Sequence, residues 1–286
     1  MKRITVLSGI VALIIFLVLS SWYFDLKLEH FNETSKDNME VVFFSFEAEG
    51  ESILISQGND DILIDTGTKD QSRKILDYLK LKEINEIDYL ILTHPLEGNI
   101  GGALDVLEQV KVKTVIQPYC GTESESLLLI NKYITDKKIN CIIPTKNRKF
   151  ILGNLNLVVY PPLKKSYTDV RNYSLATLVS YKKINMLFSA NANKKRNQEL
   201  LSVHWPKIDL YKIPNYGKEN KLSRELIYEL KPNIAVSTSD SVDNGIKEAL
   251  FKSKSKVNFI NGEYLIFSSD GENIQCTNRN GEFNGK

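Results

Sequence analysis

The feature that most constrains the fold of this chain is a series of short apolar segments that alternate with segments of helical periodicity. Runs rich in Val, Ile, Leu and Phe, each bounded by Gly, Asn, Asp or Thr, predict strands at 41–46, 52–56, 62–65 and 87–92. Apolar residues at helical spacing predict helices at 71–81, 103–110 and 123–137. This alternation predicts sheets that are covered by helices.

The second half of the chain continues in the same way. Further strands are expected at 155–160, 176–181, 186–189, 209–213, 234–237, 257–260 and 264–268, with helices at 223–230 and 245–252. A chain of 286 residues with 42% hydrophobic content can bury one sizeable core, so we expect one folded α/β domain at 39–280. The net charge of +2 is too small for overall charge to drive binding of a polyanion.

The N-terminal segment has the composition of a membrane span. No charged residue occurs from Ile4 to Phe24, and a helix of that length rises roughly 30 Å, which matches a bilayer core. Lys2 and Arg3 precede the run, so the positive-inside bias places the short N-terminus in the cytoplasm. We therefore predict a single-pass anchor within 1–24, a juxtamembrane linker at 25–38, and a C-terminal domain outside the cytoplasm. The alternative is a cleaved signal peptide, which would make the protein secreted.

The chain has three cysteines, which cannot all pair with one another. None of Cys120, Cys141 and Cys276 lies in a CxxC arrangement, which would suggest a metal or redox centre. We interpret them as small buried hydrophobic residues, and a Cys120–Cys141 disulfide is the alternative.

Three motifs follow one another in an informative order. They are Glu-Gly-Glu-Ser-Ile-Leu-Ile at 49–55, Ile-Leu-Ile-Asp-Thr-Gly at 62–67, and Leu-Thr-His-Pro at 92–95 followed by Asn-Ile-Gly-Gly at 99–102. Together they resemble the metallo-β-lactamase superfamily, and in particular the hydrolase domain of bacterial DNA-uptake (competence) proteins. The resemblance implies a four-layer αββα sandwich and, in active members, a zinc-dependent hydrolytic centre.

The first metal-binding motif departs from the family pattern. His94 matches the first histidine of the family, which carries Asp, Asp and His at the second, fourth and fifth positions after it. Those positions hold Leu96, Gly98 and Asn99 here. Leu and Gly offer no ligand atom, and a neutral amide is a poor partner for zinc, which prefers imidazole, thiolate and carboxylate.

The later motifs depart in the same manner. Asn191 stands where the family has an aspartate that bridges two metals, and Asn215 and Tyr216 stand where it has two histidines. Only three histidines occur in the chain, and of these only His94 lies in a ligand motif. A dinuclear zinc centre cannot be assembled from these residues, so we predict no metal, with His94 as the one candidate ligand.

These residues define a vestigial site, with no catalytic residue predicted. Its members are Asp65, His94, Asn99, Asn191 and Asn215. We expect His94 to hydrogen-bond Asp65 as structural support, and Asp65 to stabilise its turn. The amides could hydrogen-bond one another and fill the emptied pocket.

The function that follows is a catalytically inactive binding or scaffold module. Its partner could be nucleic acid, a cell-envelope polymer or another protein, and a purely interfacial role in a membrane complex is a third reading. The alternative from the enzyme class is a metal-dependent phosphodiesterase or nuclease with a reduced site of His94, Asp65 and Glu97, although Glu97 is more simply a solvated carboxylate.

One basic cluster could contact phosphates. Lys194, Lys195 and Arg196 lie close in sequence, with Lys182 and Lys183 nearby. We expect these side chains to form a solvated helix face, with contact to the phosphates of a polymer as the alternative.

Overall fold

The computed structural model describes residues 37–46, 49–121, 124–260 and 263–277. Contacts divide the chain between Asn38 and Met39, and the architecture below is that of the second unit. The predicted anchor at 4–24 lies outside the described residues. Within the described ranges, no helix has the length and apolar character to cross a membrane.

The first sheet contains the strands that end in the first two motifs. Its order is β15-β14-β1-β2-β3-β4-β5-β6. β1 to β3 are antiparallel neighbours, and β3, β4, β5 and β6 run parallel. The β2–β3 hairpin turns at Gly58, whose positive φ of 65° suits a residue without a Cβ. The strands are β1 (Met39–Phe44), β2 (Ile53–Gln57), β3 (Asp60–Ile64), β4 (Glu86–Ile91), β5 (Lys111–Ile116), β6 (Asn140–Ile142), β14 (Tyr264–Ser269) and β15 (Ile274–Cys276).

The second sheet carries the later motifs. Its order is β13-β12-β11-β10-β9-β8-β7, with β10 to β13 parallel and β7 to β10 antiparallel. The strands are β7 (Arg148–Leu152), β8 (Leu155–Tyr160), β9 (Ala176–Tyr181), β10 (Ile184–Phe188), β11 (Leu210–Lys212), β12 (Ile234–Ser237) and β13 (Lys256–Phe259).

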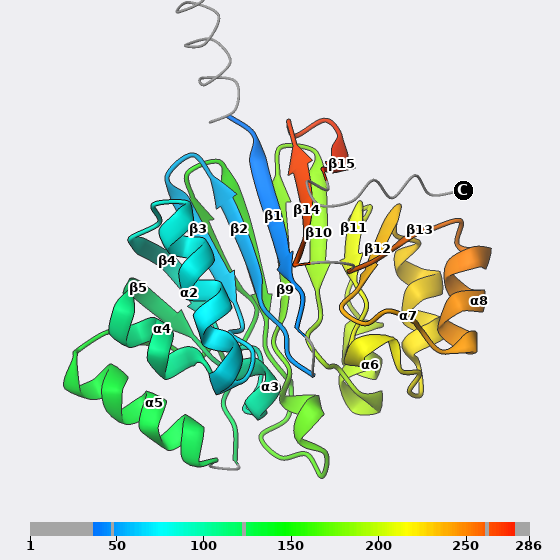
Figure 1. Cartoon of the computed structure of the whole chain (residues 1–286). Coiled ribbons are helices and arrows are strands. Elements are labelled where there is room, and N and C mark those ends of the chain that lie inside the picture. The colour runs from blue at the N-terminus through cyan, green and yellow to red at the C-terminus, as the bar shows by residue number, and fades with distance from the viewer. Residues whose placement is uncertain (1–36, 47–48, 122–123, 261–262, 278–286) are drawn as a thin grey trace, which may run out of the picture. The chain divides into compact units, whose positions relative to one another are not determined.

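Helices cover the outer face of each sheet (Figure 1). They are α2 (Ser72–Leu81), α3 (Glu97–Ile100), α4 (Ala103–Gln109), α5 (Glu125–Asp136), α6 (Lys194–Leu200), α7 (Ser223–Leu230) and α8 (Asn244–Lys252), with short 3-10 turns η1 (Lys69–Gln71), η2 (Val170–Tyr173) and η3 (Asn215–Gly217).

Three buried clusters hold these layers together. One lies between the two sheets and includes Phe43 and Phe188, whose ring centroids are 6.3 Å apart. The second packs α2, α4 and α5 on the first sheet, and the third packs α6, α7 and α8 on the second. The result is the predicted four-layer αββα sandwich, because each sheet buries one face against the other sheet and one face against helices.

Two local predictions are wrong. Arg196 does not belong to a solvated face, since its side chain is 2% exposed, pairs with Glu199 at 2.9 Å and donates to the carbonyl oxygens of Ser174 and Tyr160. The three cysteines are free thiols and half-buried, so the Cys120–Cys141 disulfide is absent and the full burial expected of them is not reached. Burial raises the pKa of the Cys141 thiol.

Candidate functional site

The predicted site residues follow the carboxyl ends of four strands. Asp65 follows β3, His94 follows β4, Asn191 follows β10 and Asn215 follows β11. β3 and β4 are parallel, as are β10 and β11, so their carboxyl ends lie at one edge of each sheet. The structure thereby brings together residues that are far apart in the sequence.

The backbone is strained where these residues meet. Asp65, Ala190, Asn215 and Tyr216 all have positive φ, from 51° to 59°. Non-glycine residues rarely adopt this conformation, and such residues cluster at functional sites because the surrounding structure must hold them there. The framework of a site is therefore retained.

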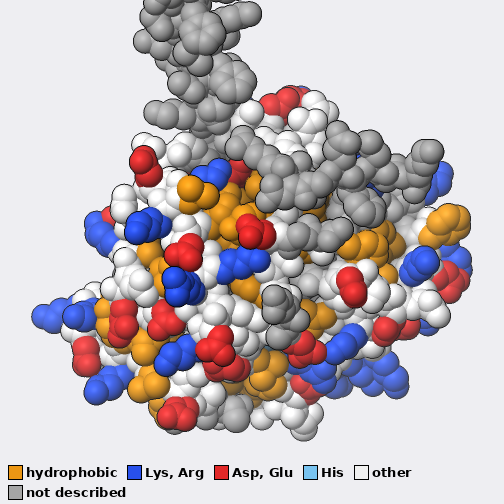
Figure 2. Space-filling model, viewed as in Figure 1, with side chains coloured by type: hydrophobic (Ala, Val, Ile, Leu, Met, Phe, Trp, Pro, Cys, Tyr) orange, Lys and Arg blue, Asp and Glu red, His pale blue; other side chains and the backbone are white. Residues whose placement is uncertain are grey.

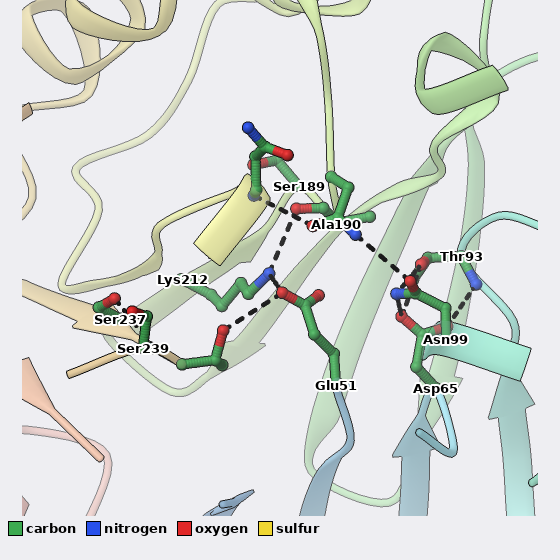
Figure 3. A network of polar contacts seen from close by, with 12 residues as sticks. Glu51, Asp65, Thr93, Asn99, Ser189, Ala190, Lys212, Ser237 and Ser239 are labelled. Carbon is green, nitrogen blue, oxygen red and sulfur yellow. Dashed lines mark hydrogen bonds and ion pairs between the residues drawn. The ribbon is translucent and has the colours of Figure 1, made fainter. Parts of the chain in front are cut away.

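Asp65 is buried and fully engaged by neighbouring donors. One carboxylate oxygen accepts from the main-chain N–H of Thr93 at 2.7 Å, and the other accepts from the Thr93 hydroxyl and the Asn99 amide, both at 2.6 Å (Figure 3). Burial raises the pKa of Asp65 to about 7, although these hydrogen bonds act to lower it. Asp65 thus holds the loop after β4 and α3 in place.

A chain of amides continues from Asp65 into the second half of the domain. Asn191 Nδ2 donates to Asn99 Oδ1 at 3.3 Å, and the main-chain N–H of Asn215 donates to Asn191 Oδ1 at 3.0 Å. The Asn99–Asn191 contact is the amide pairing that we expected, whereas Asn215 joins through its backbone. Asn99 and Asn191 are buried, so their mutual hydrogen bonds satisfy polar groups that would be costly to leave unpaired.

The predicted hydrogen bond between His94 and Asp65 is wrong. Both oxygens of Asp65 are taken by Thr93 and Asn99, and neither ring nitrogen of His94 has a hydrogen-bond partner among the described residues. His94 is 1% exposed and lines a small cavity with Leu92, Pro95, Ile100, Gln117, Pro118, Cys120 and Leu127. Burial lowers the pKa of His94 to about 4, so the imidazole is neutral at physiological pH.

A buried ion pair lies beside the amide chain and was not predicted. Lys212 pairs with Glu51, and both side chains are at most 3% exposed (Figure 3). The Lys212 ammonium also donates to the Ala190 carbonyl oxygen at 3.3 Å, and the Thr238 hydroxyl donates to Glu51 at 3.3 Å. The pair connects the segment before β2 to β11, so it ties the two sheets together. Charged residues inside otherwise apolar motifs are the signal that could have indicated it.

A pocket opens above the amide chain. Its volume is about 390 Å³ and it is lined by Glu49, Leu96, Gly98, Asn99, Arg171, Asn191, Asn215, Tyr216 and Lys218. Sequence reasoning missed Arg171 and Lys218. Arg171 donates from Nε and Nη2 to Asp169, at 3.1 and 2.9 Å, and Lys218 pairs with Glu49 at 2.8 Å.

Comparisons with known proteins agree with this geometry. Residues 49–143 match the model of the metallo-beta-lactamase superfamily. ComE operon protein 3 of Bacillus subtilis (strain 168) is 23% identical over 164 residues, which are 57% of this chain and 21% of that protein. These matches support the resemblance to the metallo-β-lactamase superfamily, and to its competence-protein branch, that the motifs carry. It spans about a fifth of the length of this competence relative.

Solved structures confirm the fold. The metallo-β-lactamase fold protein YhfI of Bacillus subtilis superposes with a TM-score of 0.58 at 11% identity, covering 82% of this chain and 100% of YhfI. Tm1679, a metal-dependent hydrolase of the β-lactamase superfamily, superposes with a TM-score of 0.51 at 14% identity, covering 78% of this chain and 96% of Tm1679.

Superfamily members usually bind zinc, but the side chains at this site do not fit it. Asn99, Asn191 and Asn215 offer amides, two of which already bond each other, and zinc prefers imidazole, thiolate and carboxylate. A Cβ added at Gly98 would meet the Tyr216 hydroxyl at 3.1 Å, so a carboxylate at that position would require Tyr216 to shift. Among the described residues, no three His, Cys, Asp or Glu side chains are grouped so as to hold a metal ion.

Proposed function

We propose that this protein is a metal-free binding module, a pseudoenzyme built on the metallo-β-lactamase fold. The observation that carries the proposal is the hydrogen-bonded chain from Asp65 through Asn99 and Asn191 to Asn215. It fills the position of the family's ligands with groups that satisfy one another. A polar network that is complete without an ion gains little from binding one.

The chemistry of hydrolysis supports the same reading. A metal in such a site lowers the pKa of a bound water to about 7 and polarises the substrate oxygen. The residues that could replace those roles are engaged or turned elsewhere: Asp65 accepts three hydrogen bonds, and His94 lines a separate, mainly apolar cavity.

The geometry does not favour the alternative hydrolase with His94, Asp65 and Glu97. Glu97 is exposed and accepts a hydrogen bond from the Ser126 hydroxyl at 2.7 Å. Among the residues that the structure describes, these three side chains are not grouped so as to hold a metal ion.

We also propose that residues 4–24 anchor the domain to the cell membrane and that the domain faces away from the cytoplasm. The apolar length of that segment and the preceding Lys2 and Arg3 support this orientation. Protease added to intact cells should digest the domain, whereas protection of the domain from protease would reject the orientation.

The test of the pseudoenzyme proposal is metal analysis of the purified full chain together with a phosphodiesterase assay. We expect no stoichiometric zinc or manganese and no hydrolysis of bis(p-nitrophenyl) phosphate with either metal added. Stoichiometric metal, with hydrolysis that is lost on His94→Ala but kept in His204→Ala, would establish the enzyme instead. His204 is exposed and lies outside the site, so it provides a matched control.

A further inference from the structure

The pocket above the amide chain has the size and construction of a ligand site. Its volume of about 390 Å³ lies within the range of small-molecule pockets, roughly 300–1,000 Å³. Its floor is formed by Asn99 and Asn191, which are at most 3% exposed and bonded to each other. The groups that remain to meet a ligand are therefore on the walls and rim.

Charges around the pocket cancel in pairs. Arg171 is matched by Asp169 at 2.9 Å, Lys218 by Glu49 at 2.8 Å, and the buried Lys212 behind the floor by Glu51. Basic and acidic side chains are also interspersed over much of the surface in view (Figure 2). Within the described lining of the pocket, each of these charges has a partner of opposite sign, so the balance favours a neutral ligand.

The pocket presents both donors and acceptors. The contacts among the described residues use Oε1 of Glu49 and Nδ2 of Asn215, which leaves the second oxygen of Glu49 and Oδ1 of Asn215 to accept. Asp169 engages Nε and Nη2 of Arg171, which leaves Nη1 to donate. A phosphate could use only the donors and a metal only the acceptors, whereas a hydroxyl group donates and accepts at once.

Tyr216 adds a donor and an apolar surface. Its hydroxyl interacts with the Asn191 side chain, and burial raises the pKa of Tyr216, so the phenol stays protonated and can donate. Leu96, 36% exposed, provides a second apolar contact in the lining. Aromatic and aliphatic surface beside polar groups suits a ligand with C–H faces as well as hydroxyls.

From these features we propose that the pocket binds a neutral, hydroxyl-rich ligand, namely a sugar unit of a glycan. This rests on the proposed function, because a site that held metal ions would be charged and would take an anionic group. Of the partners that the sequence suggests, a pocket for a neutral sugar favours a cell-envelope polymer over nucleic acid.

The experiment is calorimetric titration of the purified full chain with chitotetraose, with N-acetylglucosamine as the single-unit arm and with orthophosphate and oligothymidylate as anionic arms. We expect chitotetraose to bind, and its affinity to stay constant when salt is raised from about 0.05 to about 0.5 M, since a neutral ligand is not screened. Binding of N-acetylglucosamine as tight as that of chitotetraose would identify a free sugar as the ligand, and tighter binding of chitotetraose would identify a glycan strand.

Variants locate the site. Tyr216→Phe removes one hydroxyl donor and should weaken chitotetraose binding by roughly three- to tenfold, whereas Tyr228→Phe on the outer helix α7 should leave it unchanged. Glu49→Gln changes an exposed residue at the rim of the pocket, so the core stays folded in this variant. It therefore tests the pocket without the risk that a loss of binding reflects misfolding, as it could in Tyr216→Phe. It should change sugar affinity while leaving its salt independence intact.

Three results would overturn the inference. They are tighter binding of orthophosphate or oligothymidylate than of the sugars, no binding of any sugar, and equal effects of Tyr216→Phe and Tyr228→Phe. If the metal analysis finds no ion and no sugar binds, this inference fails alone. If stoichiometric metal is found, the proposed function fails first.

Discussion

Replacing His94 with leucine tests whether this histidine serves a metal or is a buried remnant. In the structure both ring nitrogens lack a partner among the described residues, and the cavity around them is mainly apolar. Leucine has a similar volume and no polar atom. Removing an unsatisfied buried polar group raises the free energy of unfolding by about 1–3 kcal/mol, and imperfect packing of the leucine lowers it by up to about 1.5 kcal/mol.

The pH dependence gives a second, larger difference in stability between His94→Leu and the wild type. The pKa of His94 is lowered from 6.5 to about 4 in the folded chain, so below pH 6.5 the unfolded chain binds a proton that the folded chain does not. The contribution of His94 to the stability of the wild type therefore falls as pH falls from 6.5 towards 4, and at a pH of about 5 this loss is about 2 kcal/mol. His94→Leu removes this loss, while carboxylates shared by both proteins cancel in the comparison.

The assay is urea denaturation of both proteins at pH 7.5 and pH 5, followed by circular dichroism. We expect His94→Leu to be more stable than the wild type, or less stable by no more than about 0.5 kcal/mol, at pH 7.5, and more stable by about 1.5–5 kcal/mol at pH 5. His204→Leu, at an exposed position, should shift stability by less than about 0.5 kcal/mol. The reasoning would be refuted if His94→Leu were less stable than the wild type at pH 7.5 and a chelator removed this difference in stability. Such a result would mean that the wild type gains stability from a bound metal.

Three further substitutions test other parts of the site. Lys212→Met leaves Glu51 buried without its partner and should cost about 3–5 kcal/mol in urea denaturation, while the double variant Lys212→Met/Glu51→Leu should recover most of it; no recovery would show that the pair is not the cause. For Asp65, the folded pKa of about 7 exceeds the ordinary 3.8, so the contribution of Asp65 to stability should fall as pH rises from about 4 to 7. Asp65→Asn should remove that contribution, so the difference in stability between variant and wild type should change with pH in denaturation at several pH values; a difference that is the same at every pH would contradict the pKa. Gly98→Asp restores a family carboxylate against the Tyr216 hydroxyl and should destabilise the chain by about 1–3 kcal/mol, without a zinc-dependent rise in melting temperature; such a rise would show that the metal site is easily rebuilt.

The membership of the site could be predicted from the sequence, because it depends on strand ends. Asp65, Asn191 and Asn215 each follow a recognisable apolar strand, and parallel strands place their carboxyl ends together. The contacts of His94 could not be predicted. The direction of the His94 ring depends on Gln117 and on a helix well downstream, and sequence spacing does not encode such packing.

The unpredicted parts of the fold have similar causes. The ion pair between Glu51 and Lys212 joins residues 161 positions apart, and only the packing of both sheets brings them together. The edge strand β7 has a mostly exposed pattern, so it has no clear apolar period. Elements defined by tertiary contacts rather than by their own pattern are the ones that sequence reasoning misses.

A crystal structure of the purified chain soaked in zinc, with anomalous data collected at the zinc edge, tests the central claim most directly. We predict that the Asn99 and Asn191 amides stay bonded to each other and that no anomalous peak lies among Asp65, Asn99, Asn191 and Asn215. One or two zinc ions coordinated there would contradict the account of a site that has become complete without metal.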